Sequence, residues 1–567
     1  MCGIAGIIGS NSNGIQQLES MLKSQAHRGP DATHIWNDGN VYLGHNRLSI
    51  IDLSSEADQP MVSSNGRYII VFNGEIYNYL ELKQQLLSYT FKTSSDTEVL
   101  LALFQQKGKD MLHDLNGMFA FVIYDKLKGE IFAARDRFGV KPFYYSFIGE
   151  NLVFASEIKT LFTAGVEKVK NKKVWANYLS FGTYGLPNET FWEKVNQLPG
   201  GHYFEYSLGD EKIQPVRWYD FVGNVLKMPQ LAEEELKRNY LQLLQDSIRL
   251  RFRADVAVGF NISGGLDSSV LLALVNNEFP NNNAIEAFTF YTNDYRYDEL
   301  HWVELMLEKT KKPLNKCLLQ VADVPQLIKK IATFQDEPFG GFPTLAYSQI
   351  FATAREKKVV VLLDGQGMDE AWAGYDYYQT KTGYTIQGTK TSPVRPEVLT
   401  EEYQAYASKE VYETPFDNDL QNLQYRDLFY TKIPRALRFN DRISMMHGTE
   451  LREPFLDYRL VELAFSQKEA VKIKEGQGKW LLRELMKDLL GNEVALAPKR
   501  PLQTPQREWM ASDLLEYITS KIENFSNSDL VKKDKVLSLW HEYQNGNQEN
   551  SFYIWQWINL NEMLYEN

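Results

Sequence analysis

Residues 262–269, with the sequence ISGGLDSS, decide the fold of the second half of this chain. They lie between an apolar run at 256–262, which fits a buried strand, and a helix-like apolar run at 270–275. Glycines and hydroxyls at the start of a helix present backbone N–H groups to phosphate oxygens. The sequence has no copy of the Gly-x-x-x-x-Gly-Lys-Ser/Thr loop of kinases and GTPases. The segment therefore predicts a phosphate-binding turn in a parallel α/β domain, with a plain glycine–serine connector as the alternative.

A second apolar run at 359–363 precedes residues 364–370, with the sequence DGQGMDE. Ligands of α/β folds bind at the carboxyl ends of strands, so these carboxylates are expected beside the first loop. Asp267 and Asp369 are suited to Mg²⁺ on a pyrophosphate group. Lys479 would neutralise charge that develops on the phosphates, and the alternative is a solvated lysine on a helix.

The hydrophobic pattern changes near the middle of the chain. Up to about residue 205 the apolar runs are short, as at 68–74, 119–124 and 130–134, and a helix is expected near 98–106. Beyond about residue 228 the spacing becomes helical, first at 236–248, and the C-terminal third looks mainly helical. The pattern predicts two domains, at 1–210 and 228–567, of the α+β and α/β classes.

Composition limits the function classes. A chain of 567 residues is too long for one core, and 44% hydrophobic with 24% charged residues is ordinary for a globular protein. The net charge of -12 disfavours nucleic acid, and no apolar run approaches the length of a membrane span. The N-terminus lacks the basic region of a signal peptide, and two cysteines argue against a disulfide framework. We expect a cytoplasmic protein with small-molecule ligands.

Cys2 is the first candidate nucleophile. Removal of the initiator methionine would leave a thiol and a free α-amine on one residue, which together form a nucleophile and its base. Arg47 could bind a substrate carboxylate, Asn73 and Gly74 could form an oxyanion hole, and Asp96 could hold an ammonium group. The alternatives are an accidental cysteine, a surface salt bridge at Arg47, a hairpin turn at Asn73-Gly74 and a helix N-cap at Asp96.

Six ordered segments of the first half resemble the class II glutamine amidotransferase domain: 1–6 (MCGIAG), 27–31 (HRGPD), 47–52 (RLSIID), 73–78 (NGEIYN), 95–98 (SDTE) and 135–142 (RDRFGVKP). The resemblance implies an N-terminal-nucleophile αββα sandwich in which Cys2 attacks the side-chain amide of glutamine. Asn73 and Gly74 would also be catalytic residues, as the oxyanion hole. The implied glutamine-binding residues are Arg47, Leu48, Ser49, Ile50, Ile51, Asn73, Gly74, Glu75 and Asp96.

The second half resembles the synthetase domain of glutamine-dependent asparagine synthetases. Besides the two loops and Lys479, the resemblance rests on 442–445 (RISM), 450–457 (ELREPFLD) and Pro498-Lys499-Arg500. It implies an ATP-pyrophosphatase fold that adenylates a carboxylate and receives ammonia through an internal tunnel, with ATP and Mg²⁺ required. Asp267 and Asp369 would hold the metal, and family analogy leaves a homodimer open. The implied ATP-binding residues are Ile262, Ser263, Gly264, Gly265, Asp267, Ser268, Phe290, Asp364, Gly365 and Lys479.

One position departs from the family. Typical asparagine synthetases read Ser-Gly-Glu-Gly-x-Asp-Glu, and their glutamate is implicated in forming and consuming the acyl-adenylate. Here that catalytic position is Gln366, which cannot accept a proton, so either Asp364 supplies the charge or the site works differently. Aspartate is the first choice of acceptor, giving asparagine, glutamate, AMP and diphosphate.

Other functions stay open at this point. One is the same chemistry on another carboxylate, in a cell-wall or surface-polysaccharide precursor, which the pocket around Gln366, Tyr375 and residues 340–342 would distinguish. Another is a glutamine-sensing or storage protein that has lost its chemistry. The intact loop at 263–269, with Asp267, Asp369 and Lys479 all present, speaks against such decay.

Overall fold

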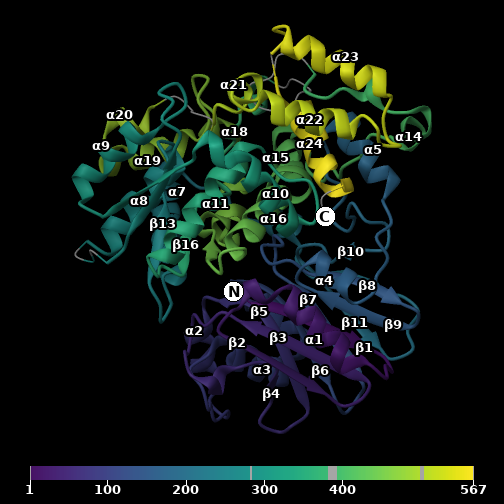
Figure 1. The fold of residues 1–567 in the computed structure, drawn as a ribbon. Coiled ribbons are helices and arrows are strands. Elements are labelled where there is room, and N and C mark those ends of the chain that lie inside the picture. Colours follow the sequence, from purple (N-terminus) through teal and green to yellow (C-terminus); the bar gives the residue numbers. More distant parts are fainter. Residues whose placement is uncertain are drawn as a thin grey trace.

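The computed structural model describes residues 2–280, 282, 284–380, 392–497, 503–548 and 550–565. The quoted Pro498-Lys499-Arg500 motif lies outside the described residues. Figure 1 shows the two halves of the chain one above the other, with the N-terminal half below and the C-terminal half above. The first strand, β1 (Gly3–Ile8), begins where the two halves meet.

Two six-stranded antiparallel sheets form the N-terminal half. The first has the order β10-β8-β9-β1-β3-β2 and combines β1 with β2 (Ala32–Asn37), β3 (Val41–Arg47), β8 (Tyr144–Ile148), β9 (Asn151–Ala155) and β10 (Asn196–Gln197). The second has the order β12-β11-β7-β6-β5-β4 and consists of β4 (Met61–Val62), β5 (Tyr68–Ile76), β6 (Gly117–Asp125), β7 (Glu130–Arg135), β11 (His202–Ser207) and β12 (Val216–Arg217). The strands expected at 68–74, 119–124 and 130–134 are confirmed.

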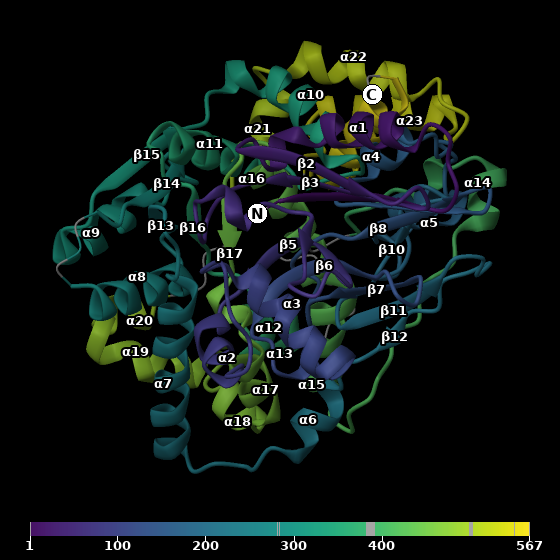
Figure 2. The same cartoon turned by 90° about the horizontal axis from the view of Figure 1, so that it is seen from below.

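The two sheets stack face to face and each carries helices on its outer side. Ile4, Val41, Val71 and Val122 are among the buried side chains packed between the sheets. Helices α1 (Gly14–Ser24) and α4 (Ile158–Thr163) cover the first sheet, and α2 (Tyr79–Gln85) and α3 (Asp96–Lys107) cover the second. Figure 2 shows these layers edge-on. The result is the αββα sandwich that the sequence predicts, and α3 confirms the helix expected near 98–106.

Five parallel strands form the sheet of the C-terminal half, in the order β15-β14-β13-β16-β17. They are β13 (Val258–Asn261), β14 (Ala287–Tyr291), β15 (Leu314–Leu318), β16 (Val361–Leu363) and β17 (Glu450–Arg452). The chain runs outward from β13 to β15, and then returns to add β16 and β17 on the other side of β13. This reversal is the switch point at which open α/β sheets bind ligands, and it lies between β13 and β16.

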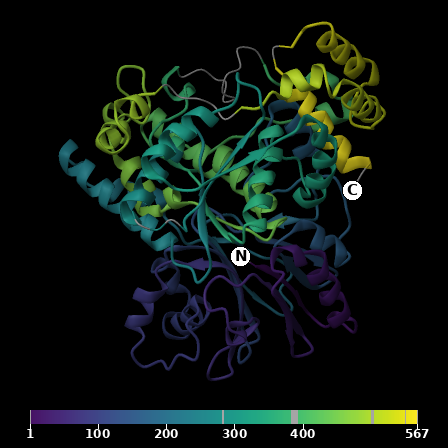
Figure 3. The same ribbon diagram turned by 60° about the vertical axis from the view of Figure 1, so that its left-hand side comes forward.

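Helices cover both faces of this parallel sheet (Figure 3). On one side, α7 (Glu233–Arg251) and α8 (Leu266–Glu278) share a buried cluster with Phe260 and Leu363. On the other side, α11 (Phe342–Glu356) and α16 (Lys432–Met445) pack near Phe288 and Leu362. The helix expected from the spacing at 236–248 is therefore confirmed as α7.

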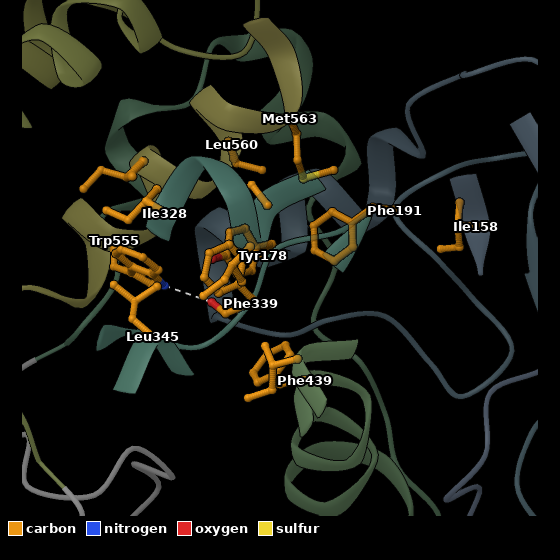
Figure 4. Close-up of a cluster of buried hydrophobic side chains, with 14 of the residues drawn as sticks. Ile158, Tyr178, Phe191, Ile328, Phe339, Leu345, Phe439, Trp555, Leu560 and Met563 are labelled. Atoms are coloured by element: carbon orange, nitrogen blue, oxygen red, sulfur yellow. Dashed lines mark hydrogen bonds between the residues drawn. The ribbon is translucent and has the colours of Figure 1, made fainter. Parts of the chain in front are cut away.

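The C-terminal helices pack against a helix of the N-terminal half. Helix α5 (Lys172–Phe181) contacts α14 (Glu401–Tyr406) and α24 (Phe552–Tyr565). Figure 4 shows the cluster: Tyr178 of α5 lies near Trp555 of α24, whose indole N–H donates to the carbonyl of Phe339 at 2.9 Å. The two halves thus share a hydrophobic core. None of the helices in the described ranges combines the length and apolarity that crossing a membrane requires.

Candidate active sites at the boundary between the halves

Cys2 lies at the start of β1 and opens into a small buried pocket. Its backbone N–H donates to the side-chain oxygen of Asn73 at 3.0 Å, and its carbonyl accepts the Nε of Arg28 at 3.1 Å. Arg28 is itself fully buried and pairs with Asp441 of the C-terminal half at 2.9 Å. Burial raises the pKa of the Cys2 thiol, so the thiol needs a nearby base to become a nucleophile.

Asn73 and Gly74 lie inside β5, which continues to Ile76. The hairpin-turn interpretation of Asn73-Gly74 is therefore wrong. The Nδ2 atom of Asn73 is buried and has no hydrogen-bond partner among the described residues. A side chain on Gly74 would come within 2.1 Å of the Met118 carbonyl, so only glycine fits. Asn73 therefore has a donor available beside Cys2, as an oxyanion hole requires.

Most of the predicted glutamine-binding residues line this pocket together with Cys2: Arg47, Leu48, Ile50, Ile51, Gly74, Glu75 and Asp96. Ser49 and Asn73 do not line it, and the backbone N–H of Ser49 donates to Asp31 at 2.8 Å. Arg47 is buried and pairs with Asp58 at 2.6 Å, so it is not a surface residue. Asp96 begins α3 while Ser95 caps the helix, and an oxygen of Asp96 accepts the Ile76 N–H at 2.9 Å.

The pocket around Cys2 has a volume of about 30 Å³, which is space for a molecule of about the size of water. A glutamine side chain needs more room than that. The guanidinium of Arg47 is held by Asp58 and by the carbonyl of Ser54, at 2.6 and 2.7 Å. Binding of a substrate carboxylate at Arg47 thus requires that one of these bonds be exchanged and the pocket widened.

Glu75 connects this pocket to the C-terminal half. Its carboxylate lies 3.7 Å from the guanidinium of Arg452, which also binds Glu450 at 2.5 Å. Burial and the neighbouring Glu450 raise the pKa of the Glu75 carboxyl well above its usual value. All three side chains are buried, so the group is a shared ionic cluster rather than a surface salt bridge.

The segment 262–269 joins β13 to α8, as the sequence predicts, and its residues 266–269 form the first turn of α8. The hydroxyl of Ser268 organises this turn, because it accepts the Ser263 N–H at 3.1 Å and donates to the Ser263 carbonyl at 2.7 Å. The N–H of Gly264 donates to a carboxylate oxygen of Glu299 at 2.9 Å. The loop lines a cavity of about 490 Å³ at the carboxyl ends of β13 and β16.

Lys479 brings the two predicted metal-binding carboxylates together. Its ammonium lies 2.6 Å from an oxygen of Asp267 and 2.7 Å from an oxygen of Asp369. Burial opposes the charge on Lys479, but the two carboxylates outweigh burial and raise its pKa. The interpretation of Lys479 as a solvated helix lysine is wrong, because the residue is only 5% exposed.

The residues present suit Mg²⁺ with a nucleotide. Mg²⁺ is commonly held by one or two carboxylates together with phosphate oxygens and waters, and Asp267 and Asp369 supply two carboxylates at one point of the cavity. In the described part of the chain, no set of three or more acidic, histidine or cysteine side chains is arranged to hold a metal ion. A metal here would therefore depend on the phosphates of the nucleotide.

Asp364 and Gln366 lie at the end of β16 in the same region. The backbone N–H of Asp364 donates to the carbonyl of Arg452 at 2.9 Å, and one of its carboxylate oxygens accepts the Gly365 N–H at 2.8 Å. Its other carboxylate oxygen is buried and has no hydrogen-bond partner among the described residues. Burial raises the pKa of the Asp364 carboxyl to about 6. Gln366 lines the 490 Å³ cavity with the loop and Lys479.

A smaller cavity next to the loop is lined by Ile262, Ser263, Ser268, Phe290 and Asp364. Phe290 at the end of β14 lies 6.1 Å from the ring of Tyr347, which also lines this space. The structure thus groups every predicted ATP-binding residue around two adjoining cavities at the switch point.

Arg452 joins the two sites, and sequence reasoning gave it no role. Its side chain reaches Glu75 in the Cys2 pocket, while its carbonyl accepts the N–H of Asp364 in the nucleotide cavity. Where the two halves meet, a cavity of about 20 Å³ is lined by Tyr77 and Met118 from one half and by Arg251 and Glu453 from the other. Arg452 lies within the quoted segment 450–457, which is the signal that could have identified it.

The sheets and the two sites define an N-terminal-nucleophile amidotransferase fused to a nucleotide-binding α/β domain. Residues 1–219 match the family model for the glutamine amidotransferase domain, and residues 239–565 match the model for asparagine synthase. The second match covers more than half of the chain, so this protein belongs to the asparagine synthase family.

Curated relatives match this chain over two thirds of its length or more. The glutamine-hydrolysing asparagine synthetase 1 of Bacillus subtilis (strain 168) is 27% identical, covering 98% of this chain and 95% of that protein. A putative glutamine-hydrolysing asparagine synthetase 2 of Methanocaldococcus jannaschii is 35% identical, covering 66% of this chain and 76% of that protein. Amidase chry2 of Gibberella zeae is 25% identical, covering 95% of this chain and 93% of that protein.

Proposed function

We propose that this protein hydrolyses glutamine at Cys2 and uses the ammonia, with ATP and Mg²⁺, to convert a carboxylate into an amide. The observation that carries the proposal is the position of Arg452, whose side chain contacts the Cys2 pocket and whose carbonyl binds Asp364 of the nucleotide cavity. The two sites therefore lie on either side of one residue. This arrangement supports transfer of ammonia within the protein, away from bulk water.

In the first half-reaction, the Cys2 sulfur attacks the side-chain amide carbon of glutamine. The α-amine of Cys2, once the initiator methionine is removed, takes the thiol proton and passes it to the leaving ammonia. The unpartnered Nδ2 of Asn73 supports a role as donor to the oxyanion, with Gly74 allowing close approach. Water then cleaves the thioester, which releases glutamate and restores the thiol.

In the second half-reaction, a carboxylate oxygen of the acceptor attacks the α-phosphorus of ATP, and pyrophosphate leaves. Ammonia attacks the acyl carbon of the resulting acyl-adenylate. The bond between this carbon and the phosphate oxygen breaks, and AMP leaves with the electron pair of that bond. Lys479 is suited to hold the negative charge of the departing pyrophosphate, because it already binds two carboxylates at this point. Mg²⁺ held by Asp267 and Asp369 would supply charge neutralisation on the phosphates.

The attacking ammonia must lose a proton, and Gln366 cannot take it. Asp364 is the residue we assign to this role. One of its carboxylate oxygens is buried without a partner among the described residues, and its raised pKa of about 6 lies close to neutral pH. Asp364 therefore provides a base at the position where the family glutamate is missing.

Aspartate is the acceptor we propose first, in keeping with the names of the relatives that cover nearly all of the chain. A second acceptor class, another carboxylate of a cell-wall or surface-polysaccharide precursor, is favoured by a specific observation. Gln366 replaces a charged residue in the cavity where the acceptor must lie. Without the negative charge of the family glutamate at this position, the cavity favours different chemical groups on the acceptor.

The test is to incubate the protein with glutamine, Mg·ATP and single acceptors led by aspartate, and to quantify AMP, pyrophosphate and amide. The proposal expects AMP and amide to form in equal amounts with aspartate. Glutamine hydrolysis without asparagine would replace aspartate by another carboxylate. Absence of AMP with every acceptor in the panel would overturn the synthetic function itself.

A further inference from the structure

The backbone of Cys2 is anchored at its carbonyl group. In the glutaminase reaction, the thiol and, after removal of the initiator methionine, the α-amine of Cys2 both exchange protons, so neither group can serve as a fixed anchor. The carbonyl takes no part in that exchange, and it accepts the Nε–H of Arg28 at 3.1 Å. The orientation of the nucleophile therefore depends on where the guanidinium of Arg28 lies.

Asp441 fixes the position of that guanidinium. Its two carboxylate oxygens accept from Nη1 and Nη2 of Arg28 at 2.9 and 3.1 Å. A two-point pair of this kind sets the plane of the guanidinium as well as its distance, while the Nε–H reaches Cys2. Arg28 is fully buried and the side chain of Asp441 is 4% exposed, so water has little access to the contact.

The carboxylate of Asp441 comes from a firmly packed helix of the other half. Asp441 lies toward the C-terminal end of α16, where Phe439 and Ile443 are buried in one hydrophobic cluster with Phe288 and Leu362 of the parallel sheet. The position of Asp441 is therefore set by the core of the synthetase half and not by the sandwich that carries Cys2.

The next residue of α16 holds the second partner of Arg28. Nη1 of Arg28 also donates to Glu157 at 3.0 Å, and the guanidinium of Arg442 lies 3.1 Å from the same oxygen of Glu157. Consecutive residues of α16 thus bind both members of one buried ion pair of the N-terminal half. A shift of α16 relative to this half would disturb both contacts at once.

We propose that Asp441 is a positioning residue of the glutaminase, which acts through Arg28 on the carbonyl of Cys2. The inference rests on the proposed function, because it requires that Cys2 attack glutamine. It adds that the glutaminase half is incomplete without α16 of the synthetase half. Neither Asp441 nor Arg28 lines the pocket around Cys2, so Asp441 affects the orientation of the nucleophile without touching the substrate.

Asp441→Asn is the first variant to test. Asparagine keeps the shape of the side chain, but it replaces one acceptor oxygen by an amide that donates and therefore faces an N–H of Arg28. We expect kcat for glutamine hydrolysis to fall about 10-fold to 100-fold with KM changed much less, because a displaced nucleophile slows the chemical step more than binding. AMP formation with ammonium chloride in place of glutamine should be nearly unchanged.

Asp336→Asn is the matched control. The side chain of Asp336 is also 4% exposed, and it lies 3.6 Å from Arg442 in the same group of buried charges, but it pairs with Arg442 rather than with Arg28. Its φ of 61° is a conformation that asparagine tolerates as well as aspartate does. A general loss of stability should appear in both variants, whereas only Asp441→Asn should slow glutamine hydrolysis.

Arg28→Lys tests whether Asp441 acts through Arg28. Lysine keeps the charge but lacks the planar fork that can bind Asp441 and Cys2 together. This variant should lose at least as much kcat as Asp441→Asn, and the double variant should lie within about threefold of Arg28→Lys alone. Asp441→Glu keeps the buried charge and should recover part of the activity, and it provides the same comparison if the asparagine variant does not fold.

Thermal unfolding and ammonia-dependent AMP formation check that each variant is folded. An unchanged kcat in Asp441→Asn, an equal loss in Asp336→Asn, or losses that multiply in the double variant would overturn the inference. All three outcomes are read against glutamate release by the unaltered protein. If the unaltered protein released no glutamate from glutamine, the proposed function at Cys2 would itself be wrong, and this inference with it.

Discussion

Lys479 donates to both carboxylate oxygens of Asp267, at 2.7 and 2.6 Å, although 212 residues separate the two in sequence. The same ammonium lies 2.7 Å from Asp369. Backbone geometry supports this position, because Lys479 adopts a left-handed conformation with φ of 59° immediately before α19 (Trp480–Leu490). A residue held in a conformation that is unfavourable for a non-glycine residue is common at functional sites.

We therefore expect Lys479→Ala to abolish most of the synthetase reaction. Loss of a positive charge that stabilises the leaving pyrophosphate should lower kcat for AMP formation by about 10²-fold to 10³-fold. Glutamine hydrolysis should persist, because Cys2 lies in the other half. Lys487→Ala on α19 is the control, since Lys487 pairs with the nearby Glu484 and is partly exposed. Wild-type AMP formation by Lys479→Ala would contradict the assignment.

Asn73→Ala should impair the glutaminase alone. Its Nδ2 has no partner among the described residues and lies beside Cys2, so its loss removes a donor to the oxyanion and should lower kcat by about 10²-fold or more, with KM changed less. Synthesis with added ammonium chloride bypasses this step and should be unaffected. The two rates are measured on the same preparation. A large rise in KM without a fall in kcat would show instead that Asn73 only binds the substrate.

Asp364 predicts the pH dependence of the amide-forming step. A base must be deprotonated, and burial raises the pKa of this carboxyl to about 6, so the rate with saturating ammonia should fall as pH drops below about 6. Asp364→Asn should lose this acidic limb and lower amide formation by about 10²-fold to 10⁴-fold. Exchange of pyrophosphate into ATP should change much less. An unaltered acidic limb in Asp364→Asn would assign the base elsewhere.

Asp457 tests the contact between the halves. Its carboxylate binds Arg251 at 3.1 Å and Asn116 of the N-terminal half at 3.0 Å. Burial opposes its charge, but Arg251 and Arg459 outweigh burial and lower its pKa. Asp457→Asn leaves the arginines without their buried partner and should lower the free energy of unfolding by about 3–5 kcal/mol at pH 7.

The pH dependence of that loss follows from the direction of the shift. Because the folded-state pKa of Asp457 is depressed, its contribution is present above the unfolded-state pKa of about 4 and is lost as pH falls below it. The difference in stability between the unaltered protein and Asp457→Asn should therefore shrink below about pH 4. Asp246→Asn is the control, because Asp246 pairs with the same Arg459 on the surface and should cost less than about 1 kcal/mol. Denaturant titrations at each pH provide the measurement.

The local parts of the fold could be predicted from the sequence. The loop at 262–269 is a continuous segment whose glycines, serines and flanking apolar runs are sufficient to place it between a strand and a helix. The strands that became β5, β6 and β7 are likewise visible as short apolar runs. These features depend on residues close together in the chain, where periodicity and turn chemistry carry the information.

Contacts between distant segments could not be predicted in this way. Nothing in the sequence around α5 indicates that Tyr178 packs near Trp555, or that Arg452 reaches Glu75. Asn73-Gly74 was compatible with a turn because its dipeptide favours one, yet tertiary packing against β6 extends the strand through it. The grouping of Asp267, Asp369 and Lys479 depends on strand order, which the pattern of hydrophobic residues does not specify. The roles assigned to these residues stay predictions until variants are measured.

The most direct test of the account follows the amide nitrogen of glutamine. The protein is supplied with glutamine labelled with ¹⁵N in the side chain, together with Mg·ATP, aspartate and an excess of unlabelled ammonium near neutral pH, and the asparagine is analysed by mass spectrometry. Cys2→Ala is the test variant, and Cys317→Ala, which alters the other buried cysteine, is its control. The account predicts labelled asparagine, with one AMP for each amide, from the unaltered protein and from Cys317→Ala, and only unlabelled product from Cys2→Ala. Labelled product from Cys2→Ala, or glutamine hydrolysis with no transfer of label to any acceptor carboxylate, would contradict it.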